Sequence, residues 1–153
     1  PRPMSGCLAI ILHAHLPFVR HPEHDEFLEE DWLFEGITET YAPLLAAFVK
    51  LRDEGVPFRI AMTVTPTLAA MLDDDLLRSR YERHLTGLRA LAEAEAQNHA
   101  ADTPMGRAAR HYVERFTEVA AFLARWGGDL LAPIRELQSS RHLEVIACNA
   151  THG

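Results

Sequence analysis

Gly6-Cys7-Leu8-Ala9-Ile10-Ile11-Leu12-His13-Ala14-His15-Leu16-Pro17 is an uncharged, mostly apolar run that ends in two histidines and a proline. Residues 7–13 predict a strand buried on both faces, as in a parallel sheet, and Pro17 ends the extended segment. Parallel α/β sheets bind ligands beyond the carboxyl ends of their strands. Because side chains alternate along an extended chain, we expect His13 and His15 to point to the same side.

Two further apolar stretches predict strands, over about residues 58–64 and 142–148. Between the first and second strands, apolar residues recur with a 3.6-residue period and predict a helix over about 31–54. Pro43 is expected to kink this helix, and Gly55 to end it. A strand, helix, strand order indicates parallel pairing. The predicted fold class is therefore α/β with parallel strands.

Residues from about 66 to 140 predict a helical insertion between the second and third strands. Its four expected helices are Pro66 to Leu72, Asp74 to Gln97, Pro104 to Trp126 and Asp129 to Ser139, and the capping signals are Thr65-Pro66, Asp73, Thr103-Pro104 and Gly127-Gly128. A crossover between two parallel strands needs only about a dozen residues, and this segment is far longer. We therefore expect its extra helices to cover a sheet or barrel. Three parallel strands leave open edges. We therefore expect residues 1–153 to be the truncated front portion of an incomplete barrel.

Composition narrows the class of protein and its partners. The 153 residues are 48% hydrophobic, with 22 acidic against 15 basic side chains and a formal charge of −7. This surplus of acid argues against nucleic acid as a partner, because phosphate binding needs clustered Lys and Arg. No apolar run reaches the length of about 20 residues that crosses a membrane, and Pro1-Arg2-Pro3-Met4 lacks the apolar core of a signal peptide. We expect a cytoplasmic protein without a membrane partner.

Cys7 and Cys148 both lie in segments predicted to be buried strands. A buried cysteine usually packs as a small hydrophobic residue, so we expect no disulfide between them.

Polar side chains gather where each predicted strand ends. They are His13 and His15 after the first strand, Thr65 and Thr67 after the second, and Asn149, Thr151 and His152 after the third. The carboxyl ends of parallel strands lie on one rim of a sheet, so these residues predict a functional site on that rim.

Two chemistries fit such a rim. In the first, His13, His15 and His152, with a later carboxylate, bind zinc and activate a water molecule, as in a metal-dependent hydrolase or deacetylase. In the second, the histidines hold sugar hydroxyls while two carboxylates elsewhere act as acid and nucleophile. Trp32 offers a flat face to a sugar ring, whereas Phe34 is expected to be core. The spacing of the histidines leaves both chemistries open.

Three blocks, in this order, resemble glycoside hydrolase family 57, in particular its 1,4-α-glucan branching enzymes. They are the His-x-His-x-Pro block Ile11 to Val19, the block Glu30 to Tyr41, and the Thr-His block Leu143 to Gly153. The resemblance implies a seven-stranded (β/α) barrel with a helical insertion. It implies retaining transglycosylation, in which an α-1,4 link of a glycogen- or amylose-like glucan is cleaved and an α-1,6 link is formed. A family 57 amylase or 4-α-glucanotransferase is the alternative within the family.

The resemblance also implies roles for particular residues. His13 and His152 carry over as substrate contacts, with His15, Thr151 and Trp32 beside them as further substrate-binding residues. The family's nucleophilic glutamate and its acid/base aspartate lie on later strands, beyond Gly153. No catalytic residue, metal or cofactor is therefore expected within residues 1–153, which would be inactive without the remainder of the parent chain.

Three acidic residues of the blocks are not expected to stand in for the catalytic pair. They are Glu35, Glu39 and Glu144, and each is better explained as a surface residue. A third hypothesis is no enzyme at all but a glucan-binding or structural fragment.

Overall fold

The computed structural model describes residue 6 and residues 8–150. Three strands, β1 (Ile11–Ala14), β2 (Ile60–Val64) and β3 (Leu143–Ile146), form one parallel sheet in the order β1-β2-β3. The α/β class with parallel strands is therefore confirmed. β2 and β3 lie inside the ranges expected for them, while β1 begins at Ile11 and runs one residue further than expected, to Ala14.

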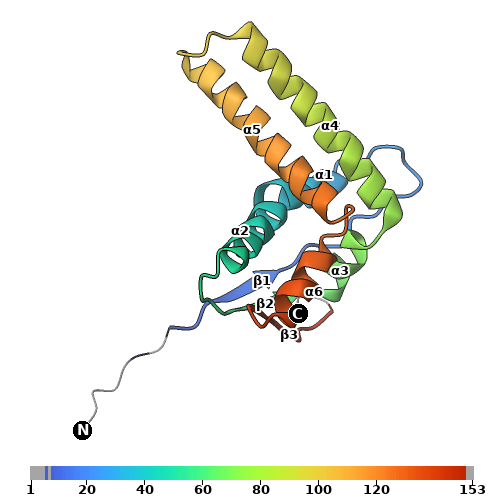
Figure 1. The fold of residues 1–153 in the computed structure, drawn as a ribbon. Coiled ribbons are helices and arrows are strands. Elements are labelled where there is room, and N and C mark those ends of the chain that lie inside the picture. Colours follow the sequence, from blue (N-terminus) through green and yellow to red (C-terminus); the bar gives the residue numbers. More distant parts are fainter. Residues whose placement is uncertain (1–5, 7, 151–153) are drawn as a thin grey trace.

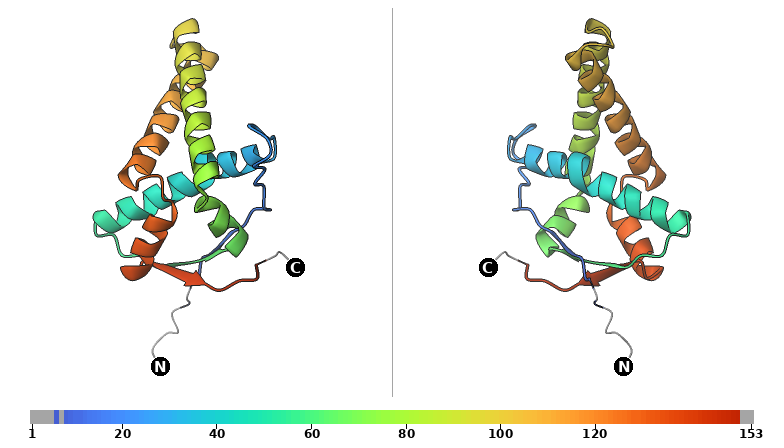
Figure 2. Two further views of the ribbon diagram at one scale, coloured as in Figure 1. Left: turned by 90° about the vertical axis from the view of Figure 1, so that its right-hand side faces the viewer. Right: turned by 90° about the vertical axis from the view of Figure 1, so that its left-hand side faces the viewer.

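The helices all lie on one side of the sheet (Figures 1 and 2). They are α1 (Glu30–Glu35), η1 (Gly36–Tyr41), α2 (Ala42–Asp53), α3 (Pro66–Leu72), α4 (Asp75–Asn98), α5 (Pro104–Arg125) and α6 (Leu131–Ser139). Figure 1 shows α4 and α5 as a long antiparallel pair that projects away from the sheet. The four helices α3 to α6 are the insertion that the sequence predicts between β2 and β3.

The prediction that the first strand is buried on both faces is wrong. The face of the sheet toward the helices is covered, since Ala14, Met62 and Leu143 are all buried. The opposite face is open, and Ile11 on it is 64% exposed. The physical reason is the one-sided layout of the helices, which leaves that face without cover from the described residues.

The helix between β1 and β2 is continuous but changes its winding at η1, which is a π-helix. The Ala42 N–H bonds back to the Ile37 carbonyl, five residues earlier, just before Pro43. Proline donates no backbone hydrogen bond and its ring collides with the carbonyl of the preceding turn, so a widened turn ahead of Pro43 relieves that crowding. Where the sequence predicts a kink at Pro43, the structure has a widened π-helical turn just before it.

Side-chain caps fix where the insertion helices begin. Thr65 Oγ1 accepts from the Leu68 N–H at the start of α3, and Thr103 caps α5 in the same way. The cap of α4 is Asp74, whose carboxylate accepts from the Leu77 N–H, and not Asp73 as the sequence suggested. An N-cap side chain accepts from a backbone N–H two or three residues further along. Asp74 does this with the Leu77 N–H, at 3.0 Å.

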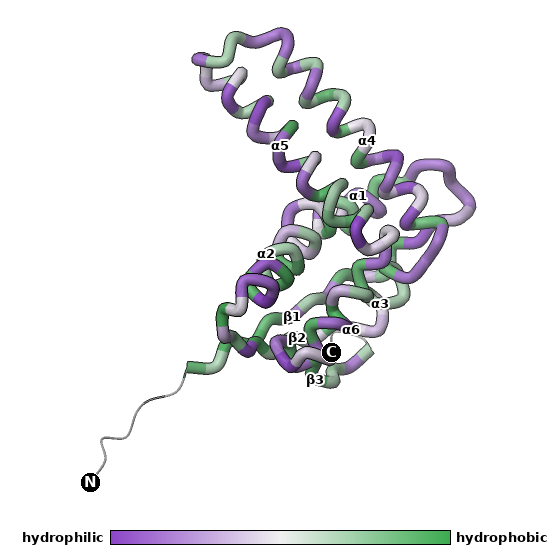
Figure 3. Tube along the Cα trace, in the orientation of Figure 1, coloured by the Kyte–Doolittle hydropathy of each residue, from purple (hydrophilic) through white to green (hydrophobic). Residues whose placement is uncertain are grey.

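The hydrophobic core lies between the covered face of the sheet and the helices. Figure 3 shows hydrophobic residues along the strands and α2, and a mostly hydrophilic loop before α1. The most completely buried large side chains include Leu33, Leu45, Leu68, Leu137 and Leu143. Burying one such leucine contributes about 1.5–3 kcal/mol. The core therefore packs α2, α3 and α6 against the sheet and so fixes the rim where β1 and β2 end.

Cys148 follows β3 instead of lying within it. Its thiol is free and half-buried, 3.6 Å from the Val64 carbonyl oxygen. Cys7 lies outside the described residues. Among those described, no helix is long and apolar enough to span a bilayer.

We predict that a protein made of residues 1–153 alone self-associates. Leu8 is 88% exposed and Ile11 64%, and among the described residues β1 and β3 are the two edge strands of the sheet. Exposed apolar surface beside an unpaired strand edge recruits other chains. Light scattering and thermal unfolding test this. A monodisperse monomer that melts cooperatively would contradict the prediction.

Candidate functional site: histidine–threonine pairs at the strand ends

His13 and Thr63 form the first pair of the site, on the open face of the sheet. The two residues are opposite each other in the register of β1 and β2. Opposite residues of neighbouring strands point to the same face, and here the His13 Nδ1 atom lies 2.5 Å from Thr63 Oγ1. The threonine hydroxyl therefore fixes the orientation of the imidazole ring.

His15 and Thr65 repeat this arrangement one step further along, beyond the ends of the strands. The Thr65 N–H donates to the Ala14 carbonyl at 3.0 Å, which continues the pairing of the two chains past β1. His15 Nδ1 lies 3.2 Å from Thr65 Oγ1. The His13 and His15 rings are stacked, with centroids 6.0 Å apart and planes 15° apart. Both rings thus lie on the same side, as side-chain alternation predicts.

Thr65 caps α3 and also contacts a histidine of the site. The sequence identified it as the cap of α3, and it does accept from the Leu68 N–H. It is also buried and touches both His15 and the Thr67 hydroxyl, at 3.1 Å from the latter. The signal was present, since both histidines precede their threonine partners by 50 residues. Two pairs with the same sequence separation are what two parallel strands in a fixed register produce.

The other predicted site residues lie outside the two histidine–threonine pairs or outside the described residues. Trp32 lies on α1 and is 50% exposed, outside the two histidine–threonine pairs. Phe34 is buried, as expected of a core residue, with its ring 5.7 Å from that of Tyr81. Thr151 and His152 lie outside the described residues.

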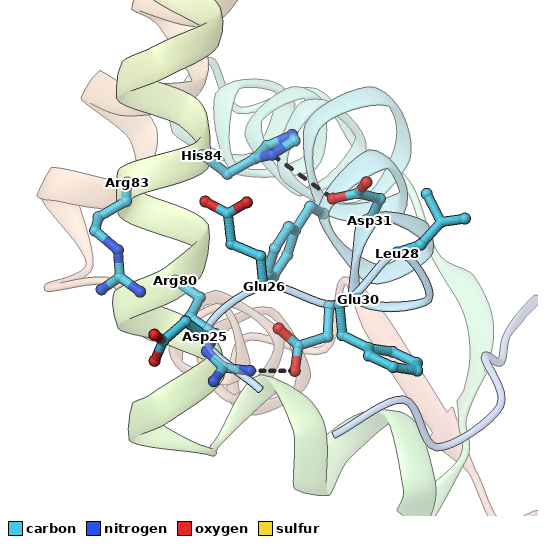
Figure 4. Close-up of a pocket in the computed structure, with 10 residues that line it drawn as sticks. Asp25, Glu26, Leu28, Glu30, Asp31, Arg80, Arg83 and His84 are labelled. Atoms are coloured by element: carbon cyan, nitrogen blue, oxygen red, sulfur yellow. Dashed lines mark hydrogen bonds and ion pairs between the residues drawn. The ribbon is translucent and has the colours of Figure 1, made fainter. Parts of the chain in front are cut away.

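A buried ion pair organises the loop that follows β1 (Figure 4). Glu30 is 1% exposed and Arg80 on α4 is 7% exposed, and an Nη1–H of Arg80 donates to the Glu30 carboxylate at 2.5 Å. The same guanidinium donates to the carbonyls of His21 and His24, and the His21 N–H donates to Glu30 at 3.1 Å. Two of these hydrogen bonds tie the loop directly to α4, and the other two join Arg80 and the loop to Glu30, the first residue of α1.

An open pocket of about 560 Å³ lies beside this ion pair, between the loop and α4. Figure 4 shows acidic Asp25, Glu26 and Asp31 facing basic Arg83 and His84 across it. The His84 ring lies 3.9 Å from the Asp31 carboxylate. Asp25, Glu26 and Asp31 thus share this pocket with Arg83 and His84 of α4, and the positive charge of Arg83 offsets part of the repulsion among the carboxylates.

Asp74 provides a second anchor for the loop. It accepts from Arg20 Nε at 2.6 Å while it caps α4. Burial on its own would raise the pKa of Asp74, but the Leu77 N–H and the Arg20 guanidinium hold it below its ordinary value. A lowered carboxylate pKa contributes stability above the unfolded-state pKa, and that contribution is lost as the pH falls through the folded-state value.

Glu35, Glu39 and Glu144, the three acidic residues of the sequence blocks, are all exposed, as expected of surface residues. Glu144 pairs with Arg59 at 3.0 Å and Glu39 with Arg115 at 3.7 Å. Within residue 6 and residues 8–150, no three His, Cys, Asp or Glu side chains come together in a way that would hold a metal ion. His152, the third ligand of the metal hypothesis, lies outside that set.

The model of glycosyl hydrolase family 57 matches residues 9–153. The 1,4-alpha-glucan branching enzyme TK1436 of Thermococcus kodakarensis is 36% identical over 98% of this chain. A probable 1,4-alpha-glucan branching enzyme of Mycobacterium tuberculosis is 31% identical over 67% of it.

Two solved structures, one of an amylase and one of a branching enzyme, share the fold of this chain over almost its whole length. The alpha-amylase AmyC of Thermotoga maritima superposes with a TM-score of 0.89 at 43% identity, over 97% of this chain and 28% of its own. The TK1436 structure, in complex with glucose, gives 0.88 at 37% identity, over 98% of this chain and 26% of its own. These relatives are (β/α)-barrel enzymes. The chain spans about a quarter of their length, 22% in the case of the TK1436 sequence.

Proposed function

This chain belongs to glycosyl hydrolase family 57, and we propose that it is the N-terminal part of the catalytic barrel of a 1,4-α-glucan branching enzyme. The observation that carries the proposal is the similarity to TK1436, which extends over 98% of this chain. The open face of the sheet supports it, because helices cover the outside of a (β/α) barrel and the uncovered face then lines the interior. That face holds His13 and Thr63.

In this proposal His13 and His15 hold hydroxyl groups of the glucan. Imidazole nitrogens are suited to this task, because each ring offers one hydrogen-bond donor and one acceptor in its neutral form. Thr63 and Thr65 keep the rings in place through contacts to both Nδ1 atoms. Trp32, Thr151 and His152 remain proposed substrate contacts. The acid and the nucleophile of the retaining reaction come from the rest of the parent chain.

The proposed reaction cleaves an α-1,4 link and transfers the released segment to a 6-hydroxyl. A glycogen- or amylose-like glucan is the substrate, and we propose glycogen biosynthesis in the cytoplasm as the process. Treating amylose with the full-length enzyme and then with a debranching enzyme tests this. Short linear chains should be released from treated amylose and not from untreated amylose.

An amylase is the second candidate, because AmyC is 43% identical to this chain. Branching is preferred because the relatives from Thermococcus and Mycobacterium are both described as branching enzymes. The two reactions differ in whether water or a sugar hydroxyl accepts the cleaved segment, so their products differ.

Removal of metal ions is expected to leave the activity of the full-length enzyme unchanged, since the histidines are proposed to bind sugar and not zinc. The rate of glucan conversion before and after dialysis against a chelator measures this, with zinc added back as the control. About one zinc per chain by elemental analysis, together with loss of activity on dialysis and recovery on zinc addition, would favour the metal-dependent hydrolase instead.

A further inference from the structure

The loop that joins β1 to α1, residues 15–29, is anchored on the insertion helices as it leaves the rim. Val19 is 1% exposed, and its N–H donates to the sulfur of Met71 on α3 at 3.3 Å. Arg20 Nε donates to Asp74, the cap of α4, at 2.6 Å. The insertion therefore determines the path of the first half of the loop.

Arg80 of α4 holds the second half of this loop and the start of α1 together. Its guanidinium donates to the His21 and His24 carbonyls and to the carboxylate of Glu30, the first residue of α1. The donors of a guanidinium lie in one plane at fixed angles, so three acceptors that share it are held in a fixed arrangement. The side chain is 7% exposed, so solvent does not loosen this arrangement.

Trp32 stands on α1 two residues after Glu30 and is 50% exposed. Gly36, whose N–H bonds to the Trp32 carbonyl, follows one helical turn later, so the two residues lie on the same face of the helix. A Cβ on Gly36 would lie 3.3 Å from Leu16 Cδ1. The face that carries Trp32 is therefore turned toward Leu16, which directly follows His15 in the chain.

We propose that Arg80 is a positioning residue that fixes the start of α1, and with it the place of the Trp32 ring beside the rim. The proposal rests on the proposed function, in which Trp32 contacts the glucan and offers the flat face of its indole to a sugar ring. A side chain that is ordered before the substrate arrives loses little freedom on binding, and this improves affinity. Arg80 thus acts on the substrate only through Trp32.

Kinetics of the full-length enzyme on amylose test this with Arg80→Lys. Lysine keeps a positive charge beside Glu30 but lacks the planar fork that reaches the two carbonyls as well. We expect KM to rise several-fold, up to about tenfold, with a smaller change in kcat, because ordering the ring then takes place during binding. Arg83→Ala on the same helix, whose guanidinium contacts the Ser79 carbonyl, should keep the wild-type KM.

A double-mutant cycle separates positioning of Trp32 from a general disturbance of the fold. Trp32→Ala should itself raise KM, and adding Arg80→Lys to it should change KM little further, because the ring through which Arg80 acts is already gone. An Arg80→Lys substitution that raises KM by the same factor with and without Trp32 would overturn the proposal. So would a Trp32→Ala enzyme with the wild-type KM.

NMR of the indole N–H groups adds a readout that does not depend on activity. The Trp32 signal, assigned by its loss in Trp32→Phe, should shift or broaden in Arg80→Lys and stay unchanged in Arg83→Ala. An unchanged Trp32 signal in Arg80→Lys would overturn the proposal. If the signal responds as expected but the wild-type enzyme does not act on glucans, the positioning of Trp32 by Arg80 stands and the proposed function fails.

Thermal unfolding shows whether Arg80→Lys is folded. If it is not, Glu30→Met/Arg80→Met takes its place in both measurements, because removing both charges together leaves no unpaired charge in the interior. The same results are then expected for KM and for the Trp32 signal. A folded double-methionine enzyme with a wild-type KM and an unchanged Trp32 signal would equally contradict the role proposed for Arg80.

Discussion

Replacing Arg80 by Ala is expected to destabilise the full-length protein by about 3–5 kcal/mol, because it leaves a buried carboxylate without its cationic partner. Glu30 is 1% exposed, so its carboxylate depends on the guanidinium for compensation of its charge. The substitution also removes the donors to the His21 and His24 carbonyls, which hold the loop after β1 on α4. We expect the loss to appear in the unfolding midpoint in denaturant.

Arg83 provides the matched control for this experiment. It is exposed on the same helix, where its guanidinium contacts only the Ser79 carbonyl among the described residues, at 3.4 Å. Arg83→Ala should change stability little, whereas the double variant Glu30→Met/Arg80→Met should recover part of the loss by removing both charges together. An Arg80→Ala protein that unfolds at the same denaturant concentration as Arg83→Ala would show that the ion pair does not stabilise the fold.

Replacing His13 by Ala is expected to lower the activity of the full-length enzyme by roughly 5- to 150-fold, if the ring binds a glucan hydroxyl in the transition state. The range corresponds to about 1–3 kcal/mol for a lost hydrogen bond to a buried partner. His13 is held by Thr63 at 2.5 Å, so its ring is oriented before the substrate arrives. Steady-state kinetics on amylose measure kcat and KM separately.

His111 on α5 serves as the control for His13, since it is an exposed histidine on a helix outside the site. His111→Ala should retain wild-type kinetics. If His13→Ala also keeps both the turnover and the Michaelis constant of the wild type, His13 does not contact the substrate.

The elements that local chemistry determines were predictable from the sequence. α3 begins and ends as expected, because Thr65 supplies the cap and Pro66 fits the first helical position. The three strands were recognised from their apolar runs. That His13 and His15 lie on the same side was predictable as well, because side-chain alternation along an extended chain requires it.

The features that depend on residues distant in the sequence were not predictable. Nothing near Glu30 indicates that it is buried, since its partner Arg80 lies 50 residues later. The exposure of Ile11 depends on where seven helical segments pack, and a pattern within one strand does not contain that information. For the contact between Thr65 and His15 the sequence holds only the shared 50-residue offset of the two histidine–threonine pairs, which acquires meaning once the register of β1 and β2 is known.

The most direct test of the proposed function is proton NMR of amylose during incubation with the full-length enzyme, read together with the reducing ends released. A branching enzyme exchanges one glycosidic link for another, so we predict that α-1,6 anomeric signals grow while the number of reducing ends changes little. The opposite result, reducing ends that accumulate without α-1,6 signals, would contradict the account and identify the parent protein as an amylase.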